Sequence, residues 1–191
     1  MIDLDDPIAL LLATVTELTK AGLEHAVYGG LALAMYGEPR ETKDADVAVA
    51  HVSLAAAQAA LSRIGATVVP AFDSVPFGGL RISRLSLLGA GKLNTVDLVT
   101  PTSPGYAARV QARVLRGRLE GQELRVVSPE DFVVLKILST REHDLQDARS
   151  VMMSLGTKLD RAVIIDEIRA LAAELPAHDV VARAAAVGLT E

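Results

Sequence analysis

The sequence predicts a fold of the α+β class, in which a small mixed α/β unit precedes an all-helical region. Half of the 191 residues are apolar, which is enough for a sizeable core. Up to residue 127, short stretches of strand-like alternation are interleaved with stretches of helical periodicity, whereas from residue 128 onward the periodicity is helical alone. We therefore expect an α/β domain over residues 1–127 and a C-terminal helical region over residues 128–191.

The elements of the first region follow from the spacing of apolar residues. The first is a helix from Pro7 to about Ala21, which is preceded by acidic residues instead of the basic residues of a signal peptide. In chain order we then expect a strand at residues 25–29, a short helix at 31–36, a strand at 44–50, a helix at 54–64, strands at 66–70, 80–88 and 94–100, a helix at 104–114 and a hairpin at 117–127.

The second region opens on a strong helix-start signal. Ser128 is a good N-cap residue, Pro129 suits the first helical position, and Asp131 places a carboxylate at the third. This helix runs on through the apolar residues 132–138. Further helices are expected near Asp144, Leu159 and Ala177, separated by Gly156 and Pro176.

Composition narrows the classes of function. The absence of cysteine excludes disulfides, thiolate metal sites and a cysteine nucleophile. No apolar run reaches the roughly 18 residues that a membrane-spanning helix needs, so we expect no membrane contact and a cytoplasmic location. The four histidines (His25, His51, His143 and His178) are scattered, and we interpret them as structural or exposed residues.

The net charge of −5 argues against a general nucleic-acid binder, but the charges are unevenly distributed. Residues 81–125 contain eight basic and three acidic residues, and the rest of the chain contains 11 basic and 21 acidic residues. A basic segment on an acidic protein suits a phosphate-rich ligand. It is equally consistent with a solvated strand and helix surface.

The first candidate for chemistry is the pair Asp44 and Asp46, which lie two residues apart on a predicted strand. Residues i and i+2 of a strand point to the same side, so the two carboxylates repel each other unless a cation neutralises them. A third carboxylate, Asp97, lies in the middle of the apolar strand "TVDLVT", where a lone buried charge would be costly. The pattern indicates a divalent-metal site, although a solvated strand end remains the simpler alternative for the pair.

Two further features surround these carboxylates in the sequence. Gly29 and Gly30 lie between a strand and a helix, where backbone N–H groups can bind a phosphate, although a tight turn would also require glycine. Lys136 is the single charge in the apolar stretch "FVVLKIL". It either bridges to Asp144 and Asp147, which share one face of the next helix, or contacts a triphosphate.

The order of these motifs resembles a known family. "YGGLALAMYGEPRETKDADVAV", "VDLVT" and "SPEDFVVLKILSTREHDLQDARSVM" together are similar to the minimal nucleotidyltransferases of the DNA polymerase β-like superfamily. Within it, they are most similar to the AbiEii/MenT-type group found as toxins of toxin–antitoxin systems. The resemblance spans Tyr28 to about Met153.

The resemblance implies a nucleotidyltransferase fold and a role for each matching residue. Gly29 and Gly30 match the turn that binds NTP phosphates, and Asp44, Asp46 and Asp97 match the carboxylates that hold Mg²⁺ or Mn²⁺, with Asp97 as the candidate base. Further matches are the nucleotide-binding Arg40 and Thr42 of an Arg-x-Thr loop and a helical motif containing Lys136, Arg141, Asp144 and Asp147. Leu31 departs from the pattern, because many active members have a serine here that helps to hold the triphosphate.

The implied reaction is transfer of a nucleoside monophosphate from an NTP to a hydroxyl group, with release of pyrophosphate. The implied acceptor is RNA, in particular a tRNA 3′ end, with a cognate antitoxin as partner, although a protein side chain is also possible. Two other readings stay open. One is a nucleotide-binding or regulatory module without turnover, which Leu31 favours, and the other is an antibiotic-type enzyme acting on a small hydroxylated molecule.

Overall fold

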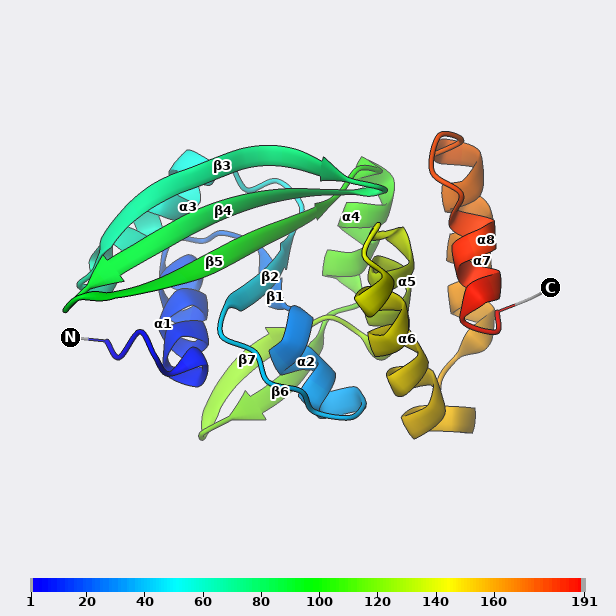
Figure 1. Cartoon of the computed structure of the whole chain (residues 1–191), viewed down its shortest axis with the longest axis horizontal. Helices are drawn as coiled ribbons and strands as arrows, with labels where there is room; N and C mark the ends of the chain where they lie inside the picture. The colour runs from blue at the N-terminus through cyan, green and yellow to red at the C-terminus, as the bar shows by residue number, and fades with distance from the viewer. Residues whose placement is uncertain (1, 190–191) are drawn as a thin grey trace.

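A computed structural model describes residues 2–189 and shows a mixed α/β architecture (Figure 1). The strands are β1 (His25–Val27), β2 (Ala45–Val49), β3 (Thr67–Phe77), β4 (Leu80–Gly89), β5 (Lys92–Pro101), β6 (Leu115–Leu119) and β7 (Gln122–Val126). The helices are α1 (Pro7–Lys20), α2 (Gly29–Tyr36), α3 (Leu54–Leu61), α4 (Pro104–Ala112), α5 (Pro129–Leu138), α6 (Glu142–Leu155), α7 (Arg161–Glu174) and α8 (Val180–Ala186), with short 3₁₀ turns at Ser62–Ile64 and Gly156–Lys158.

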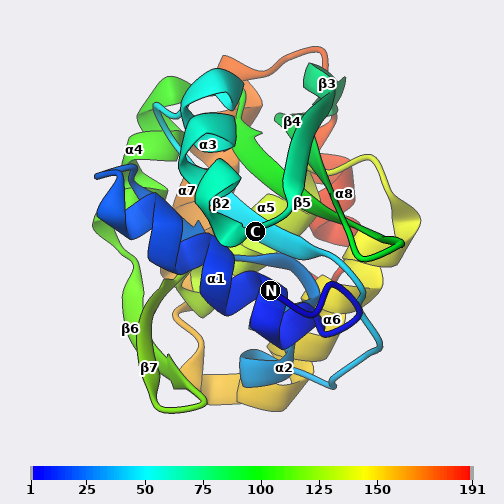
Figure 2. The same ribbon diagram turned by 90° about the vertical axis from the view of Figure 1, so that its left-hand side faces the viewer.

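The seven strands form one mixed sheet in the order β3-β4-β5-β2-β1-β7-β6. β2 runs parallel to β5, and β1 runs parallel to β7, whereas the other neighbouring pairs are antiparallel. The long β3–β5 ribbon and the β6–β7 hairpin therefore lie at opposite edges of the sheet (Figure 2). The short strands β1 and β2 lie in the middle of the sheet, between the β3–β5 ribbon and the β6–β7 hairpin, and are largely buried.

Helices cover the sheet because their apolar faces need burial. α1 and α3 pack along one side of the sheet (Figures 1 and 2), where Leu10, Leu11 and Leu61 are fully buried. α1 begins as the sequence predicts, since the Asp6 side chain accepts hydrogen bonds from the backbone N–H groups of Ile8 and Ala9. Among residues 2–189, no helix has both the length and the apolar character that a membrane span requires.

The helices after β7 gather at one end of the molecule (Figure 1). Ser128 is the N-cap of α5, its hydroxyl accepts from the Asp131 N–H, and every residue from Asp131 to Leu138 is buried. Partly buried ion pairs join these helices to α4 and to Arg113, which follows it. Arg113 donates to Asp131 in α5 through Nε at 3.0 Å, and both Arg113 and Arg109 donate to Glu167 in α7. The boundary between two domains at residue 127 stays a prediction.

The predicted order of helices and strands is confirmed, and of the differences in their extent two bear on the argument. The strand predicted at residues 66–70 continues to Phe77, although Pro70 and Pro76 interrupt its pattern. β3 tolerates both prolines because it is an edge strand, and its pairing with β4 shifts register on either side of Phe72. The helix predicted from residue 31 begins two residues earlier, so that Gly29 and Gly30 form its first turn.

The basic segment does not form one unpaired surface, and the two interpretations of its charge stay predictions. Arg84, Lys92, Arg109 and Arg113 each lie within 3.0 Å of a carboxylate oxygen. These four residues belong to three different elements, β4, β5 and α4, or follow one of them directly. Much of the positive charge therefore stabilises the fold and is not free to attract a ligand.

Candidate active site

The pairing of β2 with β5 brings the predicted carboxylates together. Asp46 and Asp97 are direct partners in the parallel register of these strands, and Asp44 lies just before β2. Their side chains each offer an oxygen, and the three oxygens lie within 4.8 Å of one another. Asp97 is only 2% exposed, whereas Asp44 and Asp46 are half-buried. Three like charges this close require compensation.

Part of this compensation comes from Arg84 on β4, which the sequence analysis did not identify as a site residue. Arg84 is the register partner of Asp97, and its Nε and one terminal nitrogen donate to the two Asp97 oxygens at 2.6 and 2.7 Å. The second contact of this guanidinium is a longer one of 3.9 Å to Asp44. Its other face lies over the ring of Phe72 in β3. An arginine in the middle of the predicted strand 80–88 was the available signal, but only the register reveals its partner.

Asp46 is the carboxylate with the least compensation. Burial is the main reason that its pKa rises from the usual 3.8 to about 7, and the charges of Asp44 and Asp97 raise it further. Without a bound cation, Asp46 is therefore partly protonated near neutral pH. A divalent ion among the three carboxylates would favour the ionised form, and carboxylate oxygens are the ligands that Mg²⁺ and Mn²⁺ prefer. The donor set thus fits the metal that the resemblance implies.

The first turn of α2 packs directly against these carboxylates. A Cβ atom on Gly29 would lie 1.8 Å from an Asp46 oxygen, and one on Gly30 would lie 2.7 Å from the Thr42 side chain. Gly29 also has a φ of +65°, in the left-handed region that favours glycine. The Tyr28 side chain makes no capping hydrogen bond, so the N–H groups of this helix start remain available. An anion could therefore bind between the helix start and a metal at Asp46.

The predicted loop and helix residues form a second charged cluster beside the first. Lys136 is 3% exposed, and its ammonium group donates to Asp144 at 2.6 Å and lies 2.8 Å from Asp147. The bridge between α5 and α6, which was one of the two readings of Lys136, is therefore present. Arg40 makes two hydrogen bonds of 3.2 Å to Asp147. Although burial acts to raise the pKa of Asp147, the hydrogen bonds from Arg40 and Lys136 hold it below its usual value.

A cavity of about 220 Å³ joins the two clusters. Its walls include all three carboxylates together with Gly29, Arg40, Lys136 and Asp144. Thr42 and Asp147 lie behind this wall, where Thr42 donates to Asp44 at 3.0 Å and Asp147 holds Arg40 and Lys136. The structure thus brings together every residue that the sequence analysis proposed for the site.

Two further side chains line this cavity, Arg141 of the predicted helical motif and His143, which was not predicted as a site residue. Arg141 lies over the Phe77 ring, 5.0 Å from its centroid, and within the described chain it makes no ion pair. His143 also lines the cavity, with Nε2 3.5 Å from Asp147, and its side chain is exposed, which is one of the two environments expected for the histidines. Its position at i−4 from Asp147 on one helix was the signal that was missed.

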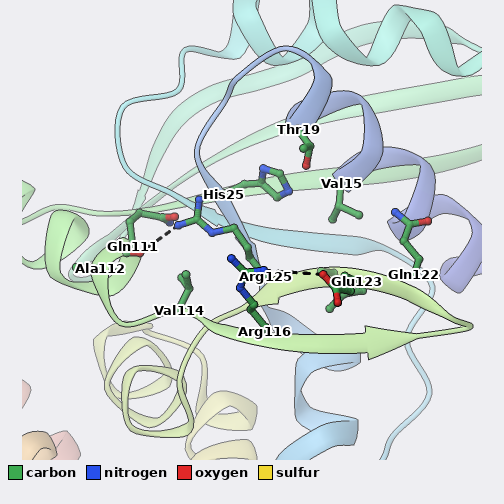
Figure 3. Close-up of a pocket in the computed structure, with 11 residues that line it drawn as sticks. Val15, Thr19, His25, Gln111, Ala112, Val114, Arg116, Gln122, Glu123 and Arg125 are labelled. Atoms are coloured by element: carbon green, nitrogen blue, oxygen red, sulfur yellow. Dashed lines mark hydrogen bonds and ion pairs between the residues drawn. The ribbon is translucent and has the colours of Figure 1, made fainter.

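A larger cavity, of about 530 Å³, lies elsewhere and contains none of these residues (Figure 3). We place the candidate active site at the smaller cavity because the carboxylates, the free helix start and the basic side chains converge there. Size alone says nothing about chemistry.

Comparisons with known proteins bear on the family and the fold of the chain. Residues 2–181 match a family described as "Nucleotidyltransferase of unknown function (DUF6036)". No curated protein sequence matches the chain.

Solved structures with a similar fold include three that cover most of the chain. An antigenic nucleotidyltransferase-like protein from Paracoccidioides brasiliensis has a TM-score of 0.55 at 22% identity, over 78% of this chain and 76% of its own. ANT(2″)-Ia, in complex with adenylyl-2″-tobramycin, has a TM-score of 0.51 at 15% identity, over 79% and 90% of the two chains. JHP933 from Helicobacter pylori has a TM-score of 0.50 at 16% identity, over 94% and 86%. At these identities the likeness shows the fold alone.

The close contact between Gly29 and Asp46 leads to a first prediction. The variant Gly29→Ala should displace the Asp46 carboxylate, because the new methyl group occupies its position, and should weaken Mn²⁺ binding at least about tenfold. Gly22→Ala is the matched control, since Gly22 also has a positive φ, of +69°, but open space around it. Because alanine at a positive φ is strained, both substitutions destabilise the backbone by a similar amount, about 1 kcal/mol. Calorimetric titration with Mn²⁺ measures the difference, and equal affinities in the two variants would contradict the arrangement.

The raised pKa of Asp46 leads to a second prediction, for metal-free protein in EDTA. Because the folded-state pKa of about 7 exceeds the unfolded value near 3.8, ionisation of Asp46 destabilises the fold progressively as the pH rises from about 4 to 7. Asp46→Asn removes this cost. It should therefore raise the free energy of unfolding by about 1–3 kcal/mol at pH 8, and by less at pH 5.

Urea denaturation at the two pH values measures this effect. Asp166→Asn serves as the control, because Asp166 is highly exposed and distant in sequence from the carboxylate cluster. A variant Asp46→Asn that is less stable than the wild type at pH 8 would show that the Asp46 carboxylate is not repelled by its neighbours.

Proposed function

This chain belongs to the DUF6036 family of nucleotidyltransferases, and from that membership we propose that it transfers a nucleoside monophosphate from an NTP to a hydroxyl group with release of pyrophosphate. The observation that carries the proposal is the convergence of three carboxylates on the uncapped start of α2. Such an arrangement offers oxygen ligands to divalent metal on one side and N–H donors to a phosphate on the other. A solvated strand end would need neither the buried Asp97 nor the glycine contact with Asp46.

The residues that would hold Mg²⁺ or Mn²⁺ are Asp44, Asp46 and Asp97. When bound, the metal would supply positive charge that stabilises the phosphates and acidifies the acceptor hydroxyl. In the reaction, the acceptor oxygen forms a bond to the α-phosphorus, the bond from that phosphorus to the bridging oxygen breaks, and pyrophosphate leaves with its electron pair. Asp97 is the candidate base for the acceptor proton. Since both of its oxygens accept from Arg84, the arginine has to release at least one of them.

Positive charge for the triphosphate comes from three side chains at the cavity wall. Arg40 and Lys136 are held in place by Asp147, so they present a fixed positive field without large rearrangement. Arg141 has no carboxylate to hold it among the described residues and is stacked on Phe77. Its guanidinium is therefore free to form bidentate hydrogen bonds with a phosphate. Asp144 and Asp147 act as positioning residues in this scheme.

The acceptor approaches, in our proposal, over the uncovered face of the β3–β5 ribbon. Register places Phe72 beside Arg84 and Arg84 beside Asp97, so this row of side chains leads from the sheet edge to the candidate base. The surrounding side chains on this face are apolar and substantially exposed, namely Val69, Val75, Leu88 and Leu93. A flat apolar floor with an arginine stacked on an aromatic ring is suited to an unpaired nucleobase.

We therefore propose an RNA 3′ end, in particular that of tRNA, as the acceptor. The similarity of the motifs to the AbiEii/MenT-type group adds the finer proposal that the protein is the toxin of a toxin–antitoxin pair, with an antitoxin as partner. The paired state of the basic segment limits the affinity for long RNA, because few phosphate contacts remain available. This suits recognition of an RNA end better than recognition of a long duplex.

Two other functions stand beside this proposal. An antibiotic-type enzyme is favoured by the fold shared with ANT(2″)-Ia, whose solved complex contains an adenylylated tobramycin. A module without turnover is favoured by Leu31, which is part of the apolar packing and brings no hydroxyl to the helix start. The complete carboxylate set argues for turnover.

The deciding experiment incubates the protein with each α-³²P-labelled NTP, Mg²⁺ and one of two acceptors, total tRNA or tobramycin. Label should appear on tRNA, and Asp97→Asn should reduce the rate at least about 100-fold, because it removes a metal ligand and the candidate base. Asp73→Asn, an exposed carboxylate on β3, is the matched control and should retain the rate.

Each other outcome identifies a different function. Label on tobramycin would establish the antibiotic-type enzyme, and label on the protein itself would identify a side chain as the acceptor. No incorporation into any acceptor, with NTP binding intact, would overturn turnover and leave the binding module.

A further inference from the structure

The 530 Å³ cavity and the candidate active site lie at opposite ends of β1. The larger cavity is enclosed by α1, the beginning of β1, the end of α4 and the β6–β7 hairpin (Figure 3). His25, the first residue of β1, lies in its wall, whereas Gly29 beyond the other end of β1 lines the active-site cavity. The two cavities share no lining residue among those the structure describes. The volume of the larger cavity, about 530 Å³, is within the range of small-molecule sites.

The cavity carries a positive charge that the described part of the chain does not balance. Arg125 of β7 is half-buried, and its guanidinium donates to the Gln111 carbonyl at 3.1 Å but makes no ion pair with any described carboxylate. Figure 3 shows this side chain extending across the cavity toward α4. Arg116 lies nearby on β6, with only a long contact of 3.9 Å to Glu123. A half-buried guanidinium without a carboxylate is costly unless an anion joins it.

The other polar groups near Arg125 add no positive charge to the cavity. His25 is 4% exposed, and its Nδ1 lies 2.8 Å from the Leu23 carbonyl, so Nδ1 carries the hydrogen and Nε2 is left as an acceptor. Burial lowers the pKa of His25, and the nearby charge of Arg125 lowers it further, although the bond to Leu23 acts in the other direction. The imidazole is thus neutral, and the charged residues that line the cavity are Arg116, Arg125 and Glu123, which leave one positive charge in excess.

The remaining walls indicate what else the ligand carries. Val15, Val114 and Leu124 supply apolar surface. Gln111 donates through Nε2 to the Ala48 carbonyl at 2.9 Å, while its Oε1 is buried without a hydrogen-bond partner. A lone buried acceptor needs a donor. A ligand that complements these residues has an anionic group to pair with Arg125 and Arg116. It also has a flat, partly apolar body to contact the apolar residues, with an N–H group that donates to Gln111.

We propose that this cavity is a second binding site, for a nucleoside phosphate, with the phosphate on Arg125 and Arg116 and the base against the valines and Gln111. The site is separate from the proposed catalytic reaction and does not depend on it. Bidentate arginine contacts suit a phosphate, and an exocyclic amine of a base supplies the missing donor.

The histidines allow both cavities to be followed in one measurement. His25 lines the proposed site, and His143 lines the active-site cavity. In ¹³C,¹⁵N-labelled protein, assigned with single His→Gln variants, the imidazole signals are recorded in EDTA during titration with AMP, CMP, GMP, UMP, ribose 5-phosphate and inorganic phosphate. We expect at least one nucleoside monophosphate to shift the His25 signals, with higher affinity than ribose 5-phosphate or inorganic phosphate.

Three variants test the assigned contacts. Arg125→Met should weaken the ligand that shifts His25 at least about tenfold. Arg116→Ala, whose side chain is 89% exposed and whose loss leaves the packing intact, should weaken it roughly fivefold. Arg118→Ala is the matched control on the same strand, outside the cavity lining, and should bind as the wild type does.

Several results would overturn the proposal. They are the absence of any His25 shift at millimolar ligand, unchanged affinity in Arg116→Ala and Arg125→Met, or equal affinity for nucleoside monophosphates and inorganic phosphate. A shift of His143 alone would assign the binding to the active-site cavity.

Discussion

Mutual repulsion of three carboxylates is the constraint on which the arrangement around β2 and β5 depends. The parallel register of these strands fixes Asp46 opposite Asp97, so the charges cannot separate without breaking the sheet. Arg84 neutralises one of them, yet Asp46 keeps a pKa of about 7. The protein thus tolerates an unfavourable cluster in its interior, as is typical of sites that await a cation or perform catalysis.

The carboxylate cluster also explains the residues found in the elements that surround it. The first turn of α2 contains two glycines because Asp46 and Thr42 leave no room for side chains. The cations of the second cluster are tied to Asp144 and Asp147, so that positive charge faces the carboxylates without collapsing onto them. Ion pairs between α4, α5 and α7 then hold the helical end in place. Ion pairs between oppositely charged side chains thus recur at the contacts between these helices, and they hold the helices that carry the site in position.

Sequence reasoning predicted the order of elements from local signals, namely strand alternation and helix caps, and it predicted most members of the candidate site from the spacing of acidic residues and from the resemblance to a family. It failed where tertiary context decides. Pro70 and Pro76 concealed the second half of β3, since only an edge position makes them compatible with a strand. The pairing of Arg84 with Asp97 could not be predicted without the β4–β5 register. Likewise, only the structure shows that Arg125 bonds to a backbone carbonyl and to no described carboxylate.

The central claim is that the three carboxylates bind a divalent metal together with a nucleotide at the start of α2. Crystals grown with Mn²⁺ and a non-hydrolysable NTP analogue test it directly through the anomalous signal of manganese. We predict manganese at coordination distance from Asp46 and Asp97, with the triphosphate against the N–H groups of Gly29 and Gly30 and with Arg84 released from at least one Asp97 oxygen. A nucleotide bound elsewhere, with no manganese at the carboxylates and the Arg84 pair intact, would contradict the account.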